Sequence, residues 1–148
     1  MGEFIGIGNT LKKIYRIYSL DILDKLEHFG HEGITFSYLE VLSFLCENEG
    51  VSLKTTGKSL GLKKQTITNH ISELEKRGYL FRTPCPNDKR SQLIFLTELG
   101  LSLKKHLFQS ISEIENSYEK IIGIIELERI RENLCKLNER LERRGELF

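Results

Sequence analysis

The sequence predicts a mostly α-helical protein that carries one small β-hairpin. Two observations predict this fold class. Over most of the chain, apolar residues recur every three or four positions, which is typical of amphipathic helices. Residues 79–96 instead hold two short apolar runs separated by a turn-rich stretch with two prolines, which is typical of paired strands. The chain has 148 residues, about the length of one domain.

Two helices are predicted in the first third of the chain. The first is expected from Leu11, because apolar residues follow it at helical spacing up to Phe29, and Gly30 is a helix-ending residue. A second helix begins near Thr35 or Ser37, either of which is a suitable N-cap. Its expected inward face consists of Phe36, Leu39, Leu42, Leu45 and Cys46.

A pair of shorter helices follows. Ser52 is the predicted N-cap of a third helix that ends at Gly61. Gly57 lies in its middle, where glycine costs roughly 1 kcal/mol relative to alanine, so we expect the next helix to approach closely there. That fourth helix is predicted over residues 64–77 and is ended by Gly78. Its expected inward side chains are Ile67, Ile71 and Leu74.

Two strands and two long helices complete the prediction. The strands are expected at residues 79–83 and 92–96, with both prolines in the loop because proline cannot donate a hydrogen bond to a strand ladder. After Thr97, one long helical pattern extends to Ile125. A last helix carries an apolar seam over two heptads, which requires a partner helix in the same subunit or across a two-fold axis. The seam consists of Leu127, Ile130, Leu134, Leu137 and Leu141.

Positive charge is concentrated in the middle of the chain. Residues 54–90 contain nine Lys and Arg residues and three acidic residues, a net charge of +6, whereas the whole chain has a net charge of +1. The remaining residues therefore carry −5. A basic segment between acidic ends is typical of a site for a polyanion. On charge alone, a solvated lysine-rich surface is an equal alternative.

The fourth helix and the hairpin together predict a DNA-binding unit. A helix fits the major groove, where Gln and Asn pair with adenine and a threonine methyl packs on thymine. The candidate residues of this helix are Lys63, Lys64, Gln65, Thr66, Thr68 and Asn69. In the hairpin, Arg90 is the candidate for the minor groove, and Lys89 and Arg82 are candidates for phosphates. We expect Asp88 to organise the loop through turn hydrogen bonds or by pairing with Arg90.

Several short motifs stand in register along this part of the chain. They are Leu60-Gly61-Leu62, Gln65-Thr66-Ile67-Thr68, the run from Leu74 to Leu80, Asp88-Lys89-Arg90, and Leu96-Thr97-Glu98-Leu99-Gly100. With helices before and after them, these motifs resemble the MarR family of winged-helix transcription regulators over residues 11–141. The resemblance implies a winged helix-turn-helix at 35–100. It also implies dimerisation helices at 1–34 and 101–148, within one structural domain.

The resemblance also implies a function. It predicts a homodimer that binds double-stranded DNA at a pseudo-palindromic operator, acts as a repressor and responds to a small-molecule effector. Asn69 departs from the arginine that is common in the family, which shifts the expected contact toward adenine or weakens it. A winged-helix module for protein or RNA without an operator stays open as the alternative. Steep salt dependence and preference for one DNA site distinguish the two. No catalytic motif appears, and we predict no enzyme activity.

The sequence gives few indications of which effector the protein binds or senses. Aromatic residues at helical spacing are candidates for a ligand pocket, although such residues are more often part of a core. They are Tyr15, Tyr18, Phe29, Phe36 and Phe108. Residues 1–45 hold no cysteine, so the peroxide-sensing chemistry of the family is not expected. Cys46 is expected to be buried and inert, and a redox role of Cys85 stays open. His28 and His31 lack a clear third ligand, so we predict no metal and no cofactor.

The sequence also predicts a cytoplasmic location. The apolar patch near the start is too short for the core of a signal peptide. The longest apolar runs, such as residues 121–125, fall far short of the length that a membrane span needs. Three widely spaced cysteines do not suggest a disulfide framework. We therefore expect no membrane partner.

Overall fold

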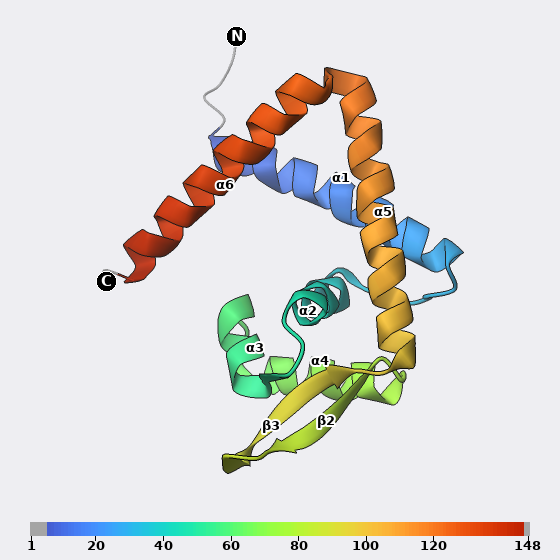
Figure 1. The fold of residues 1–148 in the computed structure, drawn as a ribbon, viewed down its shortest axis with the longest axis vertical. Helices are drawn as coiled ribbons and strands as arrows, with labels where there is room; N and C mark the ends of the chain where they lie inside the picture. The colour runs from blue at the N-terminus through green and yellow to red at the C-terminus, as the bar shows by residue number, and fades with distance from the viewer. Residues whose placement is uncertain (1–5, 147–148) are drawn as a thin grey trace. The chain divides into compact units, whose positions relative to one another are not determined.

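The computed structural model describes residues 6–146, which form six helices and three strands (Figure 1). The chain divides into two compact units, residues 1–111 and 112–148. In residues 6–146, no helix combines the length and the apolarity needed to cross a membrane. The elements are α1 (Ile7–His28), α2 (Phe36–Glu47), β1 (Val51–Ser52), α3 (Leu53–Leu60), α4 (Lys64–Lys76), β2 (Leu80–Cys85), β3 (Asp88–Leu96), α5 (Glu98–Ile122) and α6 (Ile124–Glu146).

The first two helices differ from the prediction at their starts. Helix α1 begins at Ile7 rather than Leu11, because the polar and glycine residues between them carry no apolar periodicity to mark the turn. Helix α2 is capped by Thr35, whose hydroxyl accepts a hydrogen bond from the Tyr38 backbone N–H at 3.3 Å. The inward placement of Phe36 is wrong: this side chain is 42% exposed, because it occupies the first turn, where the apolar stripe extends past the core.

The helix-turn-helix formed by α3 and α4 follows the prediction. The Ser52 hydroxyl accepts a hydrogen bond from the Thr55 backbone N–H at 3.0 Å and caps α3. A Cβ added at Gly57 would lie 2.9 Å from Cγ2 of Ile67, so the missing side chain does allow the two helices to approach closely. Gly61 ends α3 with a φ of +65°, which is the left-handed region that favours glycine. The three predicted inward side chains of α4 are buried.

A three-stranded antiparallel sheet with the order β1-β3-β2 packs beside these helices. The two-residue strand β1 was not predicted, because it is too short for an alternating pattern to be visible. The placement of the prolines in the loop is confirmed for Pro86, which lies in the turn, and wrong for Pro84. Pro84 lies in β2 opposite Gln92, next to a register shift. An edge strand tolerates proline because its outer side has no ladder to complete.

Helix α5 is joined to the end of α4 through its first turn. The Thr97 backbone N–H donates to the Tyr79 carbonyl oxygen at 3.0 Å, and its hydroxyl donates to the Gly78 carbonyl oxygen. The same hydroxyl accepts a hydrogen bond from the Gly100 N–H at 3.1 Å. A Cβ added at Gly100 would lie 2.2 Å from the Tyr79 carbonyl oxygen. Only glycine therefore fits at position 100, which explains the leucine-threonine-x-x-glycine motif.

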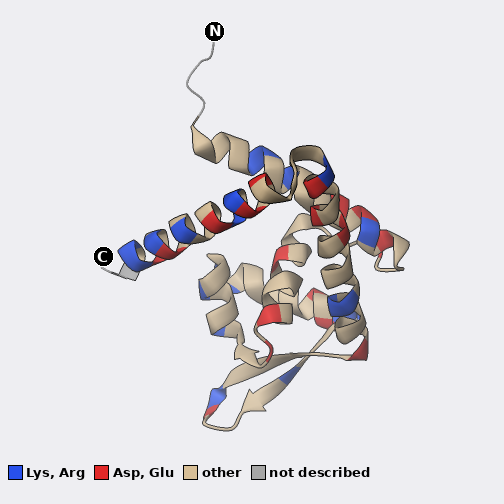
Figure 2. Ribbon diagram, turned by 45° about the horizontal axis from the view of Figure 1, so that its top comes forward, with Lys and Arg blue, Asp and Glu red and all other residues tan. Residues whose placement is uncertain are grey.

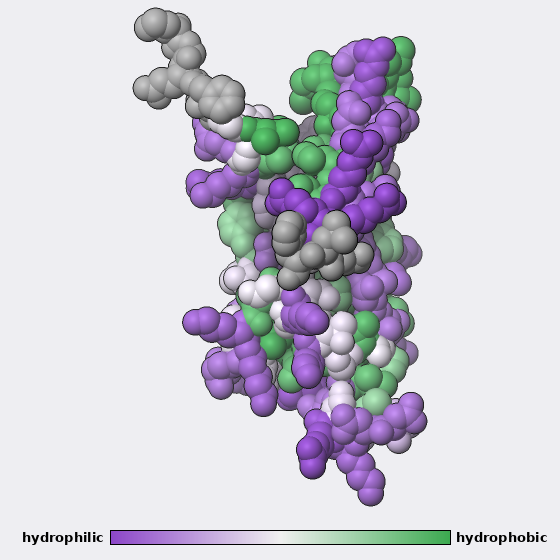
Figure 3. Space-filling view, turned by 90° about the vertical axis from the view of Figure 1, so that its left-hand side faces the viewer, coloured by the Kyte–Doolittle hydropathy of each residue, from purple (hydrophilic) through white to green (hydrophobic). Residues whose placement is uncertain are grey.

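The second unit contains the end of α5 and all of α6. Helix α5 stops at Ile122, and Gly123 follows with a φ of +85°. The prediction that Ile125 continues the long helix is therefore wrong, because this residue lies on α6. Figure 3 shows apolar surface where the two helices meet. That surface includes the exposed side chains of Ile121, Ile122, Ile124 and Ile125. An ion pair between Arg131 and Glu115 at 3.2 Å also connects the two helices.

Candidate nucleic-acid interface

The N-terminal part of α4 presents polar side chains to solvent. Lys63 is its N-cap and forms no side-chain cap hydrogen bond, so the first turn leaves backbone N–H groups without a side-chain acceptor there. Lys64, Gln65 and Asn69 are exposed. The Gln65 amide Nε2 donates to Oδ1 of Asn69 at 3.0 Å. The two amides therefore lie on one face of the helix, one turn apart, and each retains further donor and acceptor capacity.

The two threonines of this helix are less available for contact with DNA than the exposed amides. Thr66 and Thr68 are both half-buried. The Thr68 hydroxyl donates to the Lys64 carbonyl oxygen at 2.7 Å, so its proton is used inside the helix. What remains at Thr68 is an acceptor oxygen and a methyl group. The methyl group is the part that direct contact with a thymine base requires.

The tip of the β2–β3 hairpin is compact and cationic. Only residues 86–87 form the turn, so Lys89 and Arg90 belong to β3 rather than to the predicted loop. Both side chains are exposed. Asp88 Oδ1 accepts a hydrogen bond from the Arg90 backbone N–H at 2.9 Å, which is the turn hydrogen bonding that we considered from the sequence. This contact leaves the Arg90 guanidinium directed to solvent at the tip.

Arg82 is engaged within the protein. Its guanidinium Nη2 lies 3.0 Å from Oε1 of Glu75, and the Arg82 side chain is 21% exposed. A weaker contact of 3.4 Å joins it to the Ser72 hydroxyl. Arg82 therefore ties β2 to α4, and we omit it from the phosphate contacts that the sequence predicts. The pairing was not visible in the sequence because seven residues and a helix end separate the two partners.

In this region, most cations are exposed, whereas the acidic residues are engaged by other groups of the protein. Seven of the nine Lys and Arg residues between positions 54 and 90 are exposed without a partner in the ion pairs described here, and Figure 2 shows such residues on α3 and at the hairpin. The other two, Arg77 and Arg82, pair with Glu73 and Glu75. Asp88 is held by its turn hydrogen bond. All three acidic residues are thus neutralised or oriented by the protein, and the exposed charge of the region is positive.

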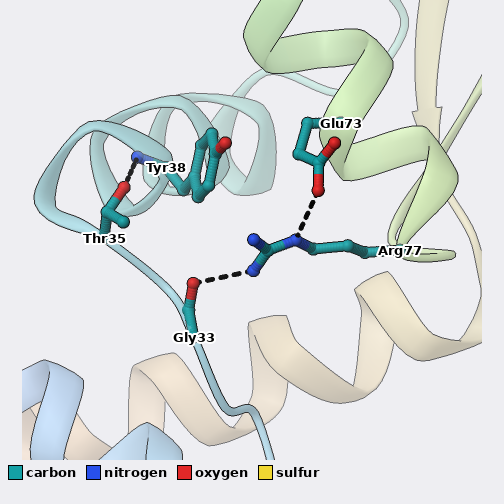
Figure 4. A network of polar contacts seen from close by, with 5 residues as sticks. All are labelled: Gly33, Thr35, Tyr38, Glu73 and Arg77. Carbon is teal, nitrogen blue, oxygen red and sulfur yellow. Dashed lines mark hydrogen bonds and ion pairs between the residues drawn. The ribbon is translucent and has the colours of Figure 1, made fainter.

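Arg77 fixes the end of α4 against the segment that joins α1 to α2. Its Nη1 donates to the Gly33 carbonyl oxygen at 2.7 Å, and its Nε contacts Glu73 at 3.2 Å (Figure 4). The guanidinium also lies over the Tyr38 ring, 5.0 Å from its centroid. The Tyr38 ring in turn meets the edge of His70 at 5.3 Å. These contacts set the position of α4 within the first unit.

A groove of about 510 Å³ lies between α1, α2 and α3, with Ile111 of α5 at its edge. Of the five aromatic residues proposed from the sequence, only Tyr15 and Tyr18 line it. Phe29 instead stacks on His106, and Phe36 and Phe108 are 42% and 45% exposed. These three residues therefore do not line this groove. The groove is lined by Tyr15, Tyr18, Ser19, Ile22, Leu39, Glu40, Ser43, Phe44, Glu47, Ser59, Leu60 and Ile111.

The cysteines and histidines of the described residues do not form a reactive or metal-binding cluster. Burial raises the pKa of the Cys46 thiol to about 11, which leaves little of the reactive thiolate at neutral pH. Cys85 is half-buried and Cys135 is exposed. His28 contacts the Asp24 carbonyl oxygen of its own helix, and His31 points inward. Within residues 6–146, no three His, Cys, Asp or Glu side chains are placed to hold a metal ion.

Comparison with known proteins shows a likeness to one family. A model of the MarR family matches residues 32–91, which include α4 and the tip of the hairpin. A crystal structure of a MarR transcriptional regulator from Methanosarcina mazei has a TM-score of 0.80 at 26% identity, and the match covers 93% of this chain and 96% of that chain. The chain thus resembles MarR-family regulators in sequence over residues 32–91 and in fold over most of its length.

Two further proteins are similar to this chain. The HTH-type transcriptional regulator SarZ of Staphylococcus saprophyticus is 28% identical over 116 residues, which cover 75% of this chain and 80% of SarZ. A crystal structure of MarR itself shares the fold, with a TM-score of 0.84 at 21% identity over 99% of this chain and 98% of that chain. The chain thus has the winged helix-turn-helix fold, and its likeness to MarR-family transcription regulators supports a DNA-binding regulator.

Sequence reasoning missed two groups of residues in this chain. The first lines the groove from α2: Glu40, Ser43, Phe44 and Glu47. Their spacing of three, four and seven positions marks a second face of that helix, a signal that was present but overlooked. The second group is a buried contact between His31, His106 and Tyr79. Its partners are 48 and 75 residues from His31, so no local pattern reveals it.

Proposed function

We propose that this protein is a sequence-specific transcription repressor that binds double-stranded DNA as a homodimer at a pseudo-palindromic operator. The observation that carries the proposal is the exposure of polar side chains on α4 together with cations at the hairpin tip. Two amides, Gln65 and Asn69, are exposed on one face of α4, and Arg90 is exposed at the hairpin tip. The exposed charge around them is positive, which suits a polyanion.

In this proposal, α4 lies in the major groove. Gln65 and Asn69 exchange their mutual hydrogen bond for contacts with adenine N6 and N7, so one exposed hydrogen bond is replaced by base contacts. Lys63 and Lys64 meet the phosphates beside the groove, where the first-turn N–H groups of the helix also favour an anion. The Thr68 methyl group packs on a thymine methyl. Phosphate contacts position the helix, and the amide contacts select the sequence.

The hairpin supplies a second contact. Arg90 enters the minor groove, where a guanidinium is attracted by the negative potential between the two phosphate backbones. Lys89, its exposed neighbour, contacts a phosphate. The hydrogen bond from the Arg90 N–H to Asp88 fixes the backbone at the tip, so less conformational entropy is lost when the arginine binds.

Exposed apolar faces on the terminal helices support the homodimer. On α1, Leu11 and Ile14 are 36% and 50% exposed. On α6, Leu127 is buried, but the rest of the predicted seam is exposed: Ile130, Leu134, Leu137 and Leu141. In aqueous solution, a regular apolar heptad seam packs against another helix. A second copy of this chain supplies a helix with an identical seam. A dimer that occupies two adjacent major grooves of a promoter excludes other proteins from that DNA, hence repression.

The proposal is tested with Arg90→Ala. We expect this change to weaken operator binding by about 1–3 kcal/mol, because it removes a minor-groove contact without touching the core. Affinity for a selected operator is measured by fluorescence anisotropy, together with the thermal melt of each variant. Arg16→Ala is the matched control, since Arg16 is exposed on the opposite side of α1 from its apolar stripe. An unchanged melt with an unchanged affinity for the operator excludes the role of Arg90.

We further propose that the groove binds the effector, and that the effector is an aromatic cation. Glu40 and Glu47 are the only charged residues that line it. The rings of Tyr15, Tyr18 and Phe44 are suited to an aromatic body and to cation–π contact. Its volume lies in the range of small-molecule sites.

The ligand class is tested with two probes of similar size and opposite charge. We expect phenyltrimethylammonium to raise the melting temperature and release the operator, and benzoate to do neither. Glu40→Gln should reduce the effect of the cation, because Glu40 is the carboxylate that Tyr15 contacts at 3.3 Å. Benzoate acting as strongly as the cation contradicts the assignment.

A further inference from the structure

A buried chain of hydrogen bonds connects three segments of the first unit. The His31 side chain is 4% exposed and lies between α1 and α2 in sequence. Its Nδ1 is 3.0 Å from the Tyr79 hydroxyl, at the end of α4. Its Nε2 is 2.9 Å from Nδ1 of His106 on α5. The His106 ring is held in turn by stacking on Phe29, with the ring centroids 4.2 Å apart.

The position of His31 and Tyr79 follows from two helix ends of the same kind. At the end of α1, Gly30 has a φ of +93°, and the next N–H, that of His31, donates to the Leu26 carbonyl oxygen at 2.9 Å. At the end of α4, Gly78 has a φ of +89°, and Tyr79 bonds back to its helix in the same way at 3.0 Å. In this motif the residue after the glycine turns inward. Two such residues meet here.

The chain of hydrogen bonds limits how many protons the two histidines can hold. Two imidazole nitrogens 2.9 Å apart share one hydrogen, so one of them must be without a proton. The uncharged pair and the singly protonated pair both satisfy this condition. A second proton places an N–H on both nitrogens, and the two positive rings repel each other. The contact between His31 and His106 must then open.

The surroundings of the pair do not favour a second positive charge. Among residues 6–146, the ionisable groups that contact His31 are His106 from α5 and Tyr79 from the end of α4. Arg77, also from the end of α4, adds positive charge near Tyr79. Burial, and then the charge of His106, lower the pKa of His31 below its usual value of 6.5. The second proton therefore binds only in acid, below about pH 6.5.

We propose that His31 and His106 are positioning residues that hold α4 against α5 while the pair carries at most one proton, so that operator binding is lost in acid. The inference rests on the proposed DNA-binding function. Opening the His31–His106 contact frees Tyr79, which follows the end of α4 directly. The orientation of α4 relative to α5 then changes. Because α5 continues toward the helices proposed to form the dimer, the spacing of the two α4 helices changes with it.

The experiment compares pH 7.5 with pH 5.5 in wild type, His106→Asn and His28→Asn. Asparagine keeps a hydrogen-bonding group near the place of Nδ1 but takes up no proton. His28 is the matched control, because it is exposed and contacts only its own helix in the described contacts. We expect wild type and His28→Asn to lose about tenfold more operator affinity in acid than His106→Asn, a coupling of the size that is typical between linked sites. General effects of pH on DNA binding cancel in this comparison.

Two further measurements separate the inference from the proposed function. Urea unfolding should show a larger loss of stability between pH 7.5 and pH 5.5 in wild type than in His106→Asn, which removes the charge of His106 but not the burial of His31. The sign follows from the lowered pKa of His31, because the unfolded chain takes up the proton first as the pH falls. In NMR spectra of the wild type, the α4 amide resonances should shift with the same midpoint as the His31 ring. This readout needs neither DNA nor a variant.

Each outcome decides a different claim. Failure to bind any operator at pH 7.5 rejects the proposed function, and the NMR titration still decides whether the histidine pair moves α4. Equal pH dependence of operator affinity in wild type and His106→Asn overturns the inference. So does titration of the His31 ring without movement of the α4 resonances. A change in stability alone, without a change in the pH dependence of affinity, also rejects it, because the contact is then only structural.

Discussion

Gly100→Ala is expected to destabilise the protein by about 3 kcal/mol. The added Cβ would lie 2.2 Å from the Tyr79 carbonyl oxygen and 3.0 Å from Cβ of Leu96. Neither neighbour can rotate away, since one is a backbone atom and the other lies next to the backbone. The carbonyl is also fixed by the hydrogen bond that it accepts from the Thr97 N–H. Alanine is the better helix former by about 1 kcal/mol, but this gain is smaller than the cost of the clash.

The measurement is urea unfolding at a fixed protein concentration, with thermal unfolding beside it. For a chain of this length, the expected loss corresponds to a melting temperature lower by about 6–12 °C. Gly8→Ala is the matched control, because Gly8 also lies near the start of a helix and a Cβ there meets nothing within 4 Å. Gly8→Ala should be neutral or slightly stabilising. Equal stability of both variants contradicts the close packing of α5 on the end of α4.

The elements that sequence predicted well are those whose ends have a local chemical cause. The cap at Ser52 and the glycine at 61 each act within one turn of the helix that they bound, so the printed sequence contains the whole reason. Gly57 is a further case, because an isolated glycine in a helix indicates a close neighbour. The errors have a physical cause as well. The exposure of Phe36 and the strand position of Pro84 depend on what packs nearby, which local periodicity does not contain.

In the candidate interface, too, the sequence pattern predicts exposure but not tertiary contacts. The exposure of Gln65, Asn69 and Arg90 agrees with the helical period and the hairpin pattern. The ion pair of Arg82 with Glu75 does not follow from either, because it depends on how β2 lies against α4. For that reason a cation counted from the sequence is an upper bound on the cations available to DNA. Which cations remain available is decided by tertiary structure.

Selection of bound sites from random and genomic DNA should yield one strongly preferred site. A homodimer that reads two major grooves requires an inverted repeat whose half-sites lie about 10 bp apart, one helical turn. Because Gln65 and Asn69 are the exposed amides of α4, we expect adenine at the selected positions of each half-site. Affinity for this site should exceed that for unrelated duplex DNA by about 10³-fold or more at physiological salt. Affinity should also fall steeply as salt is raised, because several lysine and arginine side chains displace counterions.

This selection is the most direct measurement of the central proposal, that two copies of α4 and two hairpin tips bind one DNA site. Enrichment of an inverted repeat, protected as one unit in a footprint, is the predicted result. Uniform binding to all duplexes, no binding, or enrichment of one half-site without its inverted copy contradicts a dimeric, sequence-specific regulator.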